Sequence, residues 1–296
     1  MIRRLVLLAL LAAALPVAAA AGDLVATITS GPPDPVSSHS ATFAFAASDP
    51  QALFGCALDG AAFEACSSPV TLADVPDGRH TFFVVAHSAS SNDASAPAYW
   101  TWTVDTTPPP AVTEAHKDVG YRRLVLSWAA SADTDHVVVL RSTSAKEAAG
   151  AEVYSGPASS YAEPGFVNAS YHRYAITSYD KAGNASPAVQ VVVPASALLL
   201  APADGAELRA KKPQMFRWRA IQKASYYNIQ LWRDGRKLLT TWPRTPKFRL
   251  PASWKSRGHR YELTRGYYTW FVWPGFGPLA KGRYGDLAGH AQFRAG

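Results

Sequence analysis

The chain has 296 residues, of which 48% are hydrophobic and 17% charged, with 22 prolines and 20 glycines. This length allows two or three domains, and the many turn-forming residues favour short strands over long helices. No stretch beyond residue 22 has a sustained 3.6-residue hydrophobic period, which excludes a helical fold. We therefore predict an all-β chain of tandem β-sandwiches.

Residues 1–22 have the order of a secretory signal peptide. Arg3 and Arg4 precede an apolar run from Leu5 to Leu15, and small residues with A-x-A sites follow near positions 18–21. A retained membrane anchor is the alternative, which the shortness of the apolar run disfavours. No other segment is apolar for long enough to span a bilayer, so we expect a secreted, extracellular or cell-surface protein.

The first predicted unit covers residues 23–106. Its two cysteines, Cys56 and Cys66, lie on either side of an Asp-Gly turn at residues 59–60, and the sequence has no others. Because an exported chain meets an oxidising compartment, we expect them to form a disulfide. A two-residue turn would place Cys56 opposite Phe63, so Cys66 would have to fold back beyond the strand pair.

Three patterns of this unit occur in the order F-x-C-x-LDG-x-x-F-x-x-C, DG-x-H-x-F-x-V-x-A and TWTVDTTPP. Together they resemble the bacterial immunoglobulin-like repeats of large exported surface proteins. The resemblance covers nearly the whole unit and implies an immunoglobulin-like β-sandwich.

The second predicted unit covers residues 110–194. Leu124, Leu126 and Trp128 share one face of a predicted strand, and Y-x-I-x-x-x-D-x-x-G-N-x-S follows at residues 174–186. The unit resembles a fibronectin type III domain, in which Trp128 would be the buried tryptophan of the second strand. The position of the conserved corner tyrosine falls on His172, a departure from the family.

The third predicted unit covers residues 198–296. It contains F-x-W at Phe216 and Trp218, A-x-YYNIQLW, and YTWFVWPGFG. This combination is similar to a divergent fibronectin-type-III-like domain at the C-termini of actinobacterial exported proteins. The unit has 19 Lys and Arg against 5 Asp and Glu, a net charge of +14, whereas residues 23–197 have 8 against 17, a net charge of −9. Such a split concerns partners rather than the fold.

The candidate ligand site lies in this basic unit. If Phe216 and Trp218 point inward, Arg217 and Arg219 point outward together. If Ile229 and Leu231 point inward, the even-numbered residues of the next strand form an outer row. The candidate residues are Arg217, Arg219, Tyr226, Asn228, Gln230, Trp232 and Arg233. Such a mixture suits sugar stacking or an anionic polymer, and the alternatives are a solvated basic face or docking onto the acidic second unit.

Catalytic and metal-binding motifs are missing from the sequence. The eight histidines include no pair at the i, i+4 spacing of a helical zinc site, and G-x-S-x-G and P-loop patterns are absent. We expect His80 and His172 to pack at strand starts rather than to act as acids or bases. Four turn residues have oxygen ligands suited to calcium, although closing their own turns is the favoured interpretation. They are Asp133, Asp135, Asp180 and Asn184.

These patterns favour an exported, non-enzymatic modular protein without cofactors or a bound metal. We predict attachment to an anionic cell-wall polymer or glycan through the third unit, with other surface proteins as further partners and no nucleic acid. Two alternatives stay open at this point. One is a structural spacer, and the other is a wall-active enzyme or inhibitor with its site in the loops of the third unit.

Overall fold

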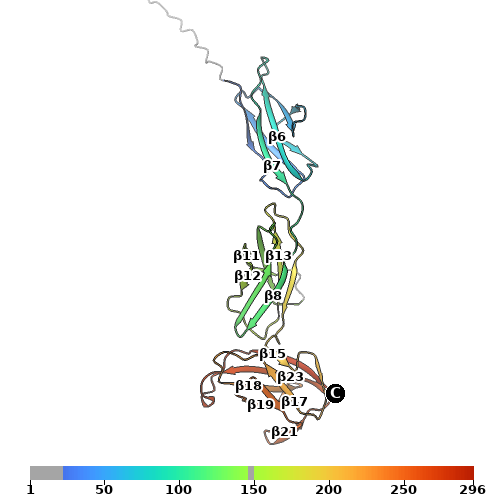
Figure 1. Cartoon of the computed structure of the whole chain (residues 1–296), viewed down its shortest axis with the longest axis vertical. Helices are drawn as coiled ribbons and strands as arrows, with labels where there is room; N and C mark the ends of the chain where they lie inside the picture. The colour runs from blue at the N-terminus through green and yellow to red at the C-terminus, as the bar shows by residue number, and fades with distance from the viewer. Residues whose placement is uncertain (1–22, 146–149) are drawn as a thin grey trace, which may run out of the picture. The chain divides into compact units, whose positions relative to one another are not determined.

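The computed structural model describes residues 23–145 and 150–296, and strands dominate it (Figure 1). The predicted all-β fold is confirmed. The chain forms two compact units, one ending at Asp105 and the other spanning Thr106–Gly296. The predicted signal peptide, residues 1–22, lies outside the described residues. Within those residues, no helix has the length and apolar character needed to cross a membrane.

The first unit is a sandwich of seven antiparallel strands. One sheet has the order β1-β2-β5 and the other β4-β3-β6-β7. Their bounds are β1 Ala26–Ser30, β2 Ala41–Ala47, β3 Leu53–Leu58, β4 Glu64–Cys66, β5 Val70–Leu72, β6 Gly78–His87 and β7 Ala98–Val104. Fully buried Phe43, Phe82 and Trp102 fill the space between the sheets, and the first two rings stack with centroids 4.2 Å apart. Offset aromatic pairs of this kind add to the stabilisation from apolar burial.

The cysteine hairpin of this unit differs from its predicted register. Cys56 lies opposite Glu64 rather than Phe63, and Cys66 lies within β4 opposite Phe54. The disulfide between Cys56 and Cys66 is present and runs diagonally across the strand pair. Asp59 and Gly60 do form a tight turn, with φ of 52° and 79° and the backbone N–H of Ala61 donating to the carbonyl of Leu58, but strand pairing starts only at Glu64, one residue out of the simple two-residue register.

The second sandwich uses the same strand order. Its sheets are β12-β9-β8 and β11-β10-β13-β14. The strands are β8 Thr113–Gly120, β9 Arg123–Ala129, β10 His136–Ser142, β11 Ala151–Gly156, β12 Ser160–Ala162, β13 His172–Tyr179 and β14 Val189–Val193. Leu124, Leu126 and Trp128 are all buried, as the alternation along β9 predicts.

The third sandwich repeats this order with two additions. Its sheets are β15-β17-β20 and β16-β24-β23-β18-β19. The strands are β15 Leu199–Ala201, β16 Ala206–Leu208, β17 Gln214–Trp218, β18 Tyr226–Arg233, β19 Arg236–Thr241, β20 Lys247–Leu250, β23 Gly266–Gly275 and β24 Gly289–Ala295. The additions are β16, which pairs in parallel with β24, and a hairpin of β21 Ser253–Ser256 and β22 His259–Glu262. One architecture therefore occurs three times.

The core of the third sandwich fixes which faces are exposed. Phe216 and Trp218 from the smaller sheet meet Trp270 of the larger sheet, with the rings of Phe216 and Trp270 centred 5.0 Å apart. Ile229 and Leu231 of β18 are buried in the same layer. Because both sheets direct these residues toward each other, their outer faces point in opposite directions.

Candidate functional site

The outer face of the smaller sheet of the third sandwich is basic. Along β17, Phe216 and Trp218 are buried while Met215 and Arg217 are exposed, so the predicted phase is correct. Arg217 lies directly opposite Lys247, and Met215 lies opposite Arg249. Cations from two neighbouring strands therefore share one face, which we call the β17–β20 basic face: Arg217, Lys247 and Arg249.

Apart from Arg233 and Arg236, of which Arg233 is paired with Asp234, two like-charged pairs face each other across strand ladders in this sandwich. One is Arg217 with Lys247, and the other is Lys255 with Arg260 on the β21–β22 hairpin. Like charges at directly opposed positions destabilise a sheet by a few tenths of a kcal/mol up to about 1 kcal/mol. An anion bound across either pair would remove this repulsion.

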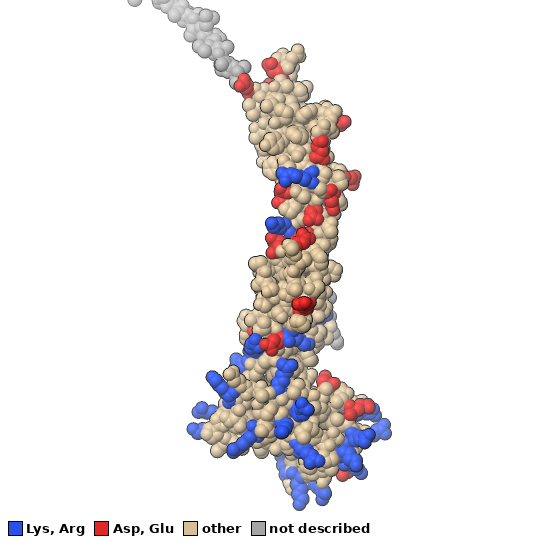
Figure 2. All heavy atoms as spheres, in the orientation of Figure 1, with Lys and Arg blue, Asp and Glu red and all other residues tan. Residues whose placement is uncertain are grey.

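The five acidic residues of the third sandwich are engaged elsewhere. Four form ion pairs, and Asp204 accepts a hydrogen bond from the backbone of Gln292. The four pairs are Glu207 with Arg294, Asp234 with Arg233, Glu262 with Lys211 and Asp286 with Arg122. Figure 2 shows how densely Lys and Arg cover this sandwich. Within residues 198–296, no acidic partner neutralises the β17–β20 basic face.

The predicted seven-residue site is not a single site. Gln230 and Trp232 lie on β18, in the larger sheet, whereas Arg217 lies on β17 in the smaller one. The core separates the two outer faces, so these side chains cannot contact one ligand molecule together. Arg219 follows β17 and is exposed, and its guanidinium lies 3.4 Å from the carbonyl oxygen of Val119 in the second sandwich.

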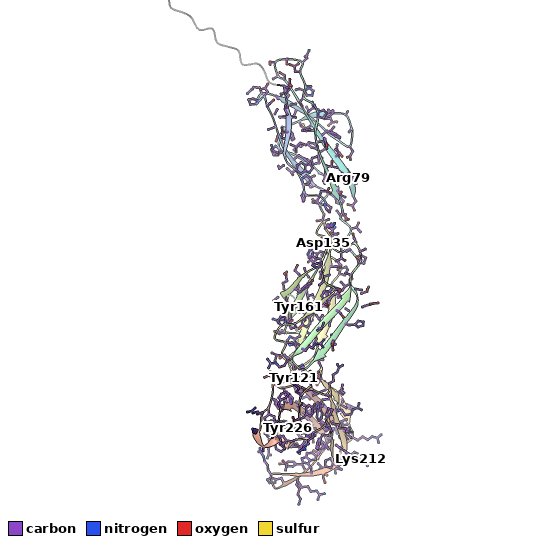
Figure 3. The ribbon with its side chains drawn as sticks, turned by 60° about the vertical axis from the view of Figure 1, so that its left-hand side comes forward. Arg79, Tyr121, Asp135, Tyr161, Lys212 and Tyr226 are labelled. Carbon is purple, nitrogen blue, oxygen red and sulfur yellow. A yellow bond between two sulfur atoms is a disulfide. The ribbon has the colours of Figure 1, made fainter. Side chains whose placement is uncertain are left out.

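Tyr226 and Asn228 were expected on an open surface, and both are buried. Their exposed fractions are 2% and 6%. Figure 3 labels Tyr226 within the third sandwich. Its ring lies against Gly275, where a Cβ atom would come within 2.1 Å of it, and its hydroxyl donates to the carbonyl of Arg283. The segment after Gly275 therefore folds over Tyr226. Neither side chain is available to a ligand.

Arg233 is a structural residue rather than a ligand-binding one. It has the same phase as buried Leu231, and its guanidinium donates to the hydroxyl groups of Thr264 and Tyr268. Its other nitrogens bond to the carbonyl of Arg265 and the carboxylate of Asp234. These contacts hold the loop before β23 against the end of β18.

A pocket that the sequence did not reveal lies beside β16 and β24. It has a volume of about 430 Å³ and contains three arginines and one carboxylate. Its lining includes Arg209, Arg265, Arg294 and Glu207. Only the parallel pairing of β16 with β24 brings these residues together, and no local spacing signals that pairing.

The contact between the second and third sandwiches has charges opposite to those expected from the acidic–basic split. Asp286 of the third sandwich pairs with Arg122 of the second, with nitrogen and oxygen 3.3 Å apart. The hydroxyl of Tyr121 also donates to the carbonyl of Asp286. Burial raises the pKa of Tyr121, and the Asp286 carboxylate adds to the shift.

The second sandwich buries an ionic cluster. The side chain of Glu163 is 3% exposed and pairs with Arg141, which is 34% exposed. Glu163 also accepts hydrogen bonds from the hydroxyls of Tyr161, at 2.9 Å, and Tyr174, at 3.4 Å. Burial, reinforced by the bond to Glu163, raises the pKa of Tyr161 to about 12. Burial likewise raises the pKa of Tyr174. No local pattern in the sequence predicts this cluster.

The two histidines at strand starts are buried and hydrogen-bonded. His80 bonds through Nδ1 to Asp59 at 2.7 Å and through Nε2 to the carbonyl of Pro76 at 2.8 Å. The bond to Asp59 raises the pKa of His80, against the effect of burial. His172 is 6% exposed, and its Nε2 lies 3.2 Å from the carbonyl of Val167.

The candidate calcium ligands serve a turn. Asp180 accepts two hydrogen bonds from Asn184, one from its backbone and one from its side chain, each at 2.8 Å. This is the Asx-type closure that such turns favour. In the described parts of the chain, no three His, Cys, Asp or Glu side chains come together as a metal site.

Comparison with known proteins gives likeness of structure only. No protein-family model and no curated protein matches the sequence. The fibronectin(III)-like modules of Clostridium thermocellum CbhA match 57% of this chain and 92% of theirs, with 15% identity and a TM-score of 0.41. The FN1-FN3 domains of chicken CNTN1 match 93% of this chain and 99% of theirs, with 10% identity and a TM-score of 0.27.

A third likeness is to the Clostridium perfringens spore cortex lytic enzyme SleM, over 35% of each chain, with 14% identity and a TM-score of 0.26. The β-sandwich fold of this chain follows from its own strand order, whatever these likenesses.

Proposed function

We propose that this is an exported, non-enzymatic attachment protein that binds an anionic polymer through the β17–β20 basic face. The observation that carries the proposal is the direct opposition of Arg217 and Lys247, with Arg249 on the same face and every acidic residue of the sandwich engaged elsewhere. In this proposal the first two sandwiches act as spacers.

The binding chemistry is a sum of weak contacts. A single exposed ion pair contributes about 0–1 kcal/mol. A cluster of like charges on one sheet face creates a field that concentrates polyanions near it. Phosphate, carboxylate or sulfate groups repeated along a polymer would bridge the opposed cations. A cell-wall polymer or a sulfated glycan has this repeating charge.

The test compares two full-length triple variants on immobilised heparin and on a glycerol-phosphate polymer. One variant neutralises the face with Arg217→Gln, Lys247→Gln and Arg249→Gln. The control removes the same charge from exposed positions of the same sandwich with Lys212→Gln, Arg244→Gln and Lys281→Gln. We expect the face variant to elute at clearly lower salt than the control, because it loses three cations that lie together on one sheet face. Both should elute below about 1 M salt, where the Debye length is about 3 Å and screening is nearly complete.

An equal loss of retention in both variants would show that only the net charge of the sandwich matters, and it would refute binding through a defined face. Absence of retention on both polymers at low salt would refute attachment and leave the structural-spacer function. Release of soluble fragments from the polymer would instead support an enzyme. Export is tested separately by mass spectrometry of secreted protein, which we expect to begin near residues 21–23.

A further inference from the structure

The opposite outer face of the third sandwich has a different chemistry. Its central strand, β23, directs Tyr268, Trp270 and Val272 into the core, so the alternate residues lie on the outer face. These are Tyr267, Thr269, Phe271 and Trp273. Tyr267 is 61% exposed, and the other three are half-buried.

The neighbouring strands complete a regular grid on this face. Trp232 of β18 lies opposite Thr269, which lies opposite Gln292 of β24. In the next row, Gln230 lies opposite Phe271, which lies opposite His290. Each of these cross-strand rows therefore contains an aromatic ring. We call this series the aromatic strip: Tyr267, Trp232, Phe271 and Trp273.

Contacts within the strip hold its rings in place. The ring centroids of Phe271 lie 5.8 Å from Trp273 and 6.2 Å from Trp232. The indole of Trp232 donates to Gln230, and the amide of Gln230 donates to Asn228, both at 3.0 Å. Because these side chains are already ordered, a ligand would lose little affinity to immobilising them.

The strip ends in a hollow on the molecular surface. This hollow has a volume of about 270 Å³ and includes Trp232, Tyr267, Thr269 and Gln292 in its lining. Two rings thus stand beside a hydroxyl and an amide. Arg233 and Asp234 also line the hollow, and their opposite charges are paired with each other. The combination of apolar ring faces with a few neutral hydrogen-bonding groups is that of a site for an uncharged, hydroxyl-rich ligand.

The length of the strip indicates an extended ligand. Six residue steps separate Tyr267 from Trp273, which corresponds to about 20 Å at about 3.4 Å per residue. Three of the rings follow one strand and Trp232 stands beside them on β18, an elongated arrangement that matches an extended chain better than a coiled one. We propose that the aromatic strip binds an extended, uncharged β-linked polysaccharide, with sugar rings stacked on the aromatic side chains and their hydroxyls bonded to the amide groups.

This site is independent of the basic face, and its test is made under conditions that suppress charge. Full-length protein is mixed with insoluble cellulose and chitin at about 1 M salt, where polyanion binding is screened. We expect retention on at least one of them and weaker retention on insoluble starch, whose chains coil. The double variant Tyr267→Ala with Trp232→Ala should lose affinity by about tenfold or more, equivalent to about 1.4 kcal/mol.

The matched control is the double variant Tyr99→Ala with Phe63→Ala, which removes a tyrosine that is 69% exposed and a phenylalanine that is 47% exposed, both in the first sandwich. It should bind as the unaltered protein does. If the Trp232 substitution disturbs folding, as judged by circular dichroism, the single variant Tyr267→Ala carries the test because that side chain is largely exposed.

Absence of retention on cellulose and chitin, equal retention on starch, or unchanged binding in the strip variants would overturn the proposal. Sedimentation showing dimers that the Tyr267→Ala change dissociates would also overturn it, since a second copy would then occupy the strip. None of these results affects the heparin test at low salt, so the two proposals fail separately.

Discussion

Replacement of Arg141 by Met should destabilise the second sandwich and reveal how its buried carboxylate is held. The side chain of Glu163 is 3% exposed, so the change would leave a carboxylate in the core with two tyrosine hydroxyls as partners. Removing one partner of a buried ion pair costs about 3–5 kcal/mol. Arg141 itself is 34% exposed and retains part of its hydration, which places the expected loss near the lower limit, at about 3 kcal/mol.

The assay is amide hydrogen exchange of the full-length chain, followed by mass spectrometry on peptides from β10 and β13. These strands pair along their whole length and report the opening of this sandwich alone. The double variant Arg141→Met with Glu163→Leu should recover all but about 1 kcal/mol of the stability that the single variant loses, because well-packed apolar side chains often replace a buried ion pair without loss of stability.

Two results would refute this reasoning. A loss below about 1 kcal/mol for Arg141→Met would mean that the pair behaves like an exposed one. A double variant as unstable as the single variant would mean that the arginine stabilises the sandwich by packing its aliphatic chain rather than by compensating the charge of Glu163.

Three further predictions concern the other sandwiches. Trp218→Ala should lower the free energy of unfolding in urea by about 3–5 kcal/mol. Trp218→Phe should lower it much less, because the buried indole N–H that it removes has no hydrogen-bond partner among the described residues. Equal losses in the two variants would contradict this. Replacing Cys56 and Cys66 by Ser should lower the free energy of unfolding of the first unit by about 2.5–3 kcal/mol in the chain-entropy account, which is measured as a lower melting temperature. The pKa of His80 followed by NMR should lie above 6.5 and fall in Asp59→Asn, so the stabilisation from this pair is complete below pH 6.5 and lost as the pH rises through the pKa of folded His80.

Strand phases were predictable from the sequence because burial imposes a period of two. The alternation of Phe216 and Trp218 with charged residues identified the inner and outer faces of β17 correctly. The same rule placed Tyr226 on the correct face of the sheet, but it predicted an exposed side chain where the structure has a buried one. Periodicity locates a face but does not show what covers it, and here the segment after Gly275 returns over the ring.

Relations between strands were beyond the sequence. The rule of alternation applies within each strand, so it could not show that Arg217 and Trp232 belong to opposite sheets. The cysteine register was also missed, because the Asp-Gly turn closes but the pairing of β3 with β4 starts only at Glu64. No local pattern in the sequence shows this one-residue shift.

The added strand β16 also limits how this protein can associate. In the second sandwich the last strand, β14, is a sheet edge, and in the first a parallel bridge from Val36 covers only the Val104 end of β7. Backbone groups left unpaired on such an edge can recruit another strand. In the third, β16 occupies the corresponding edge beside β24. Strand addition to β24 is therefore blocked there, and the edge that a further strand would meet is the three-residue β16 itself.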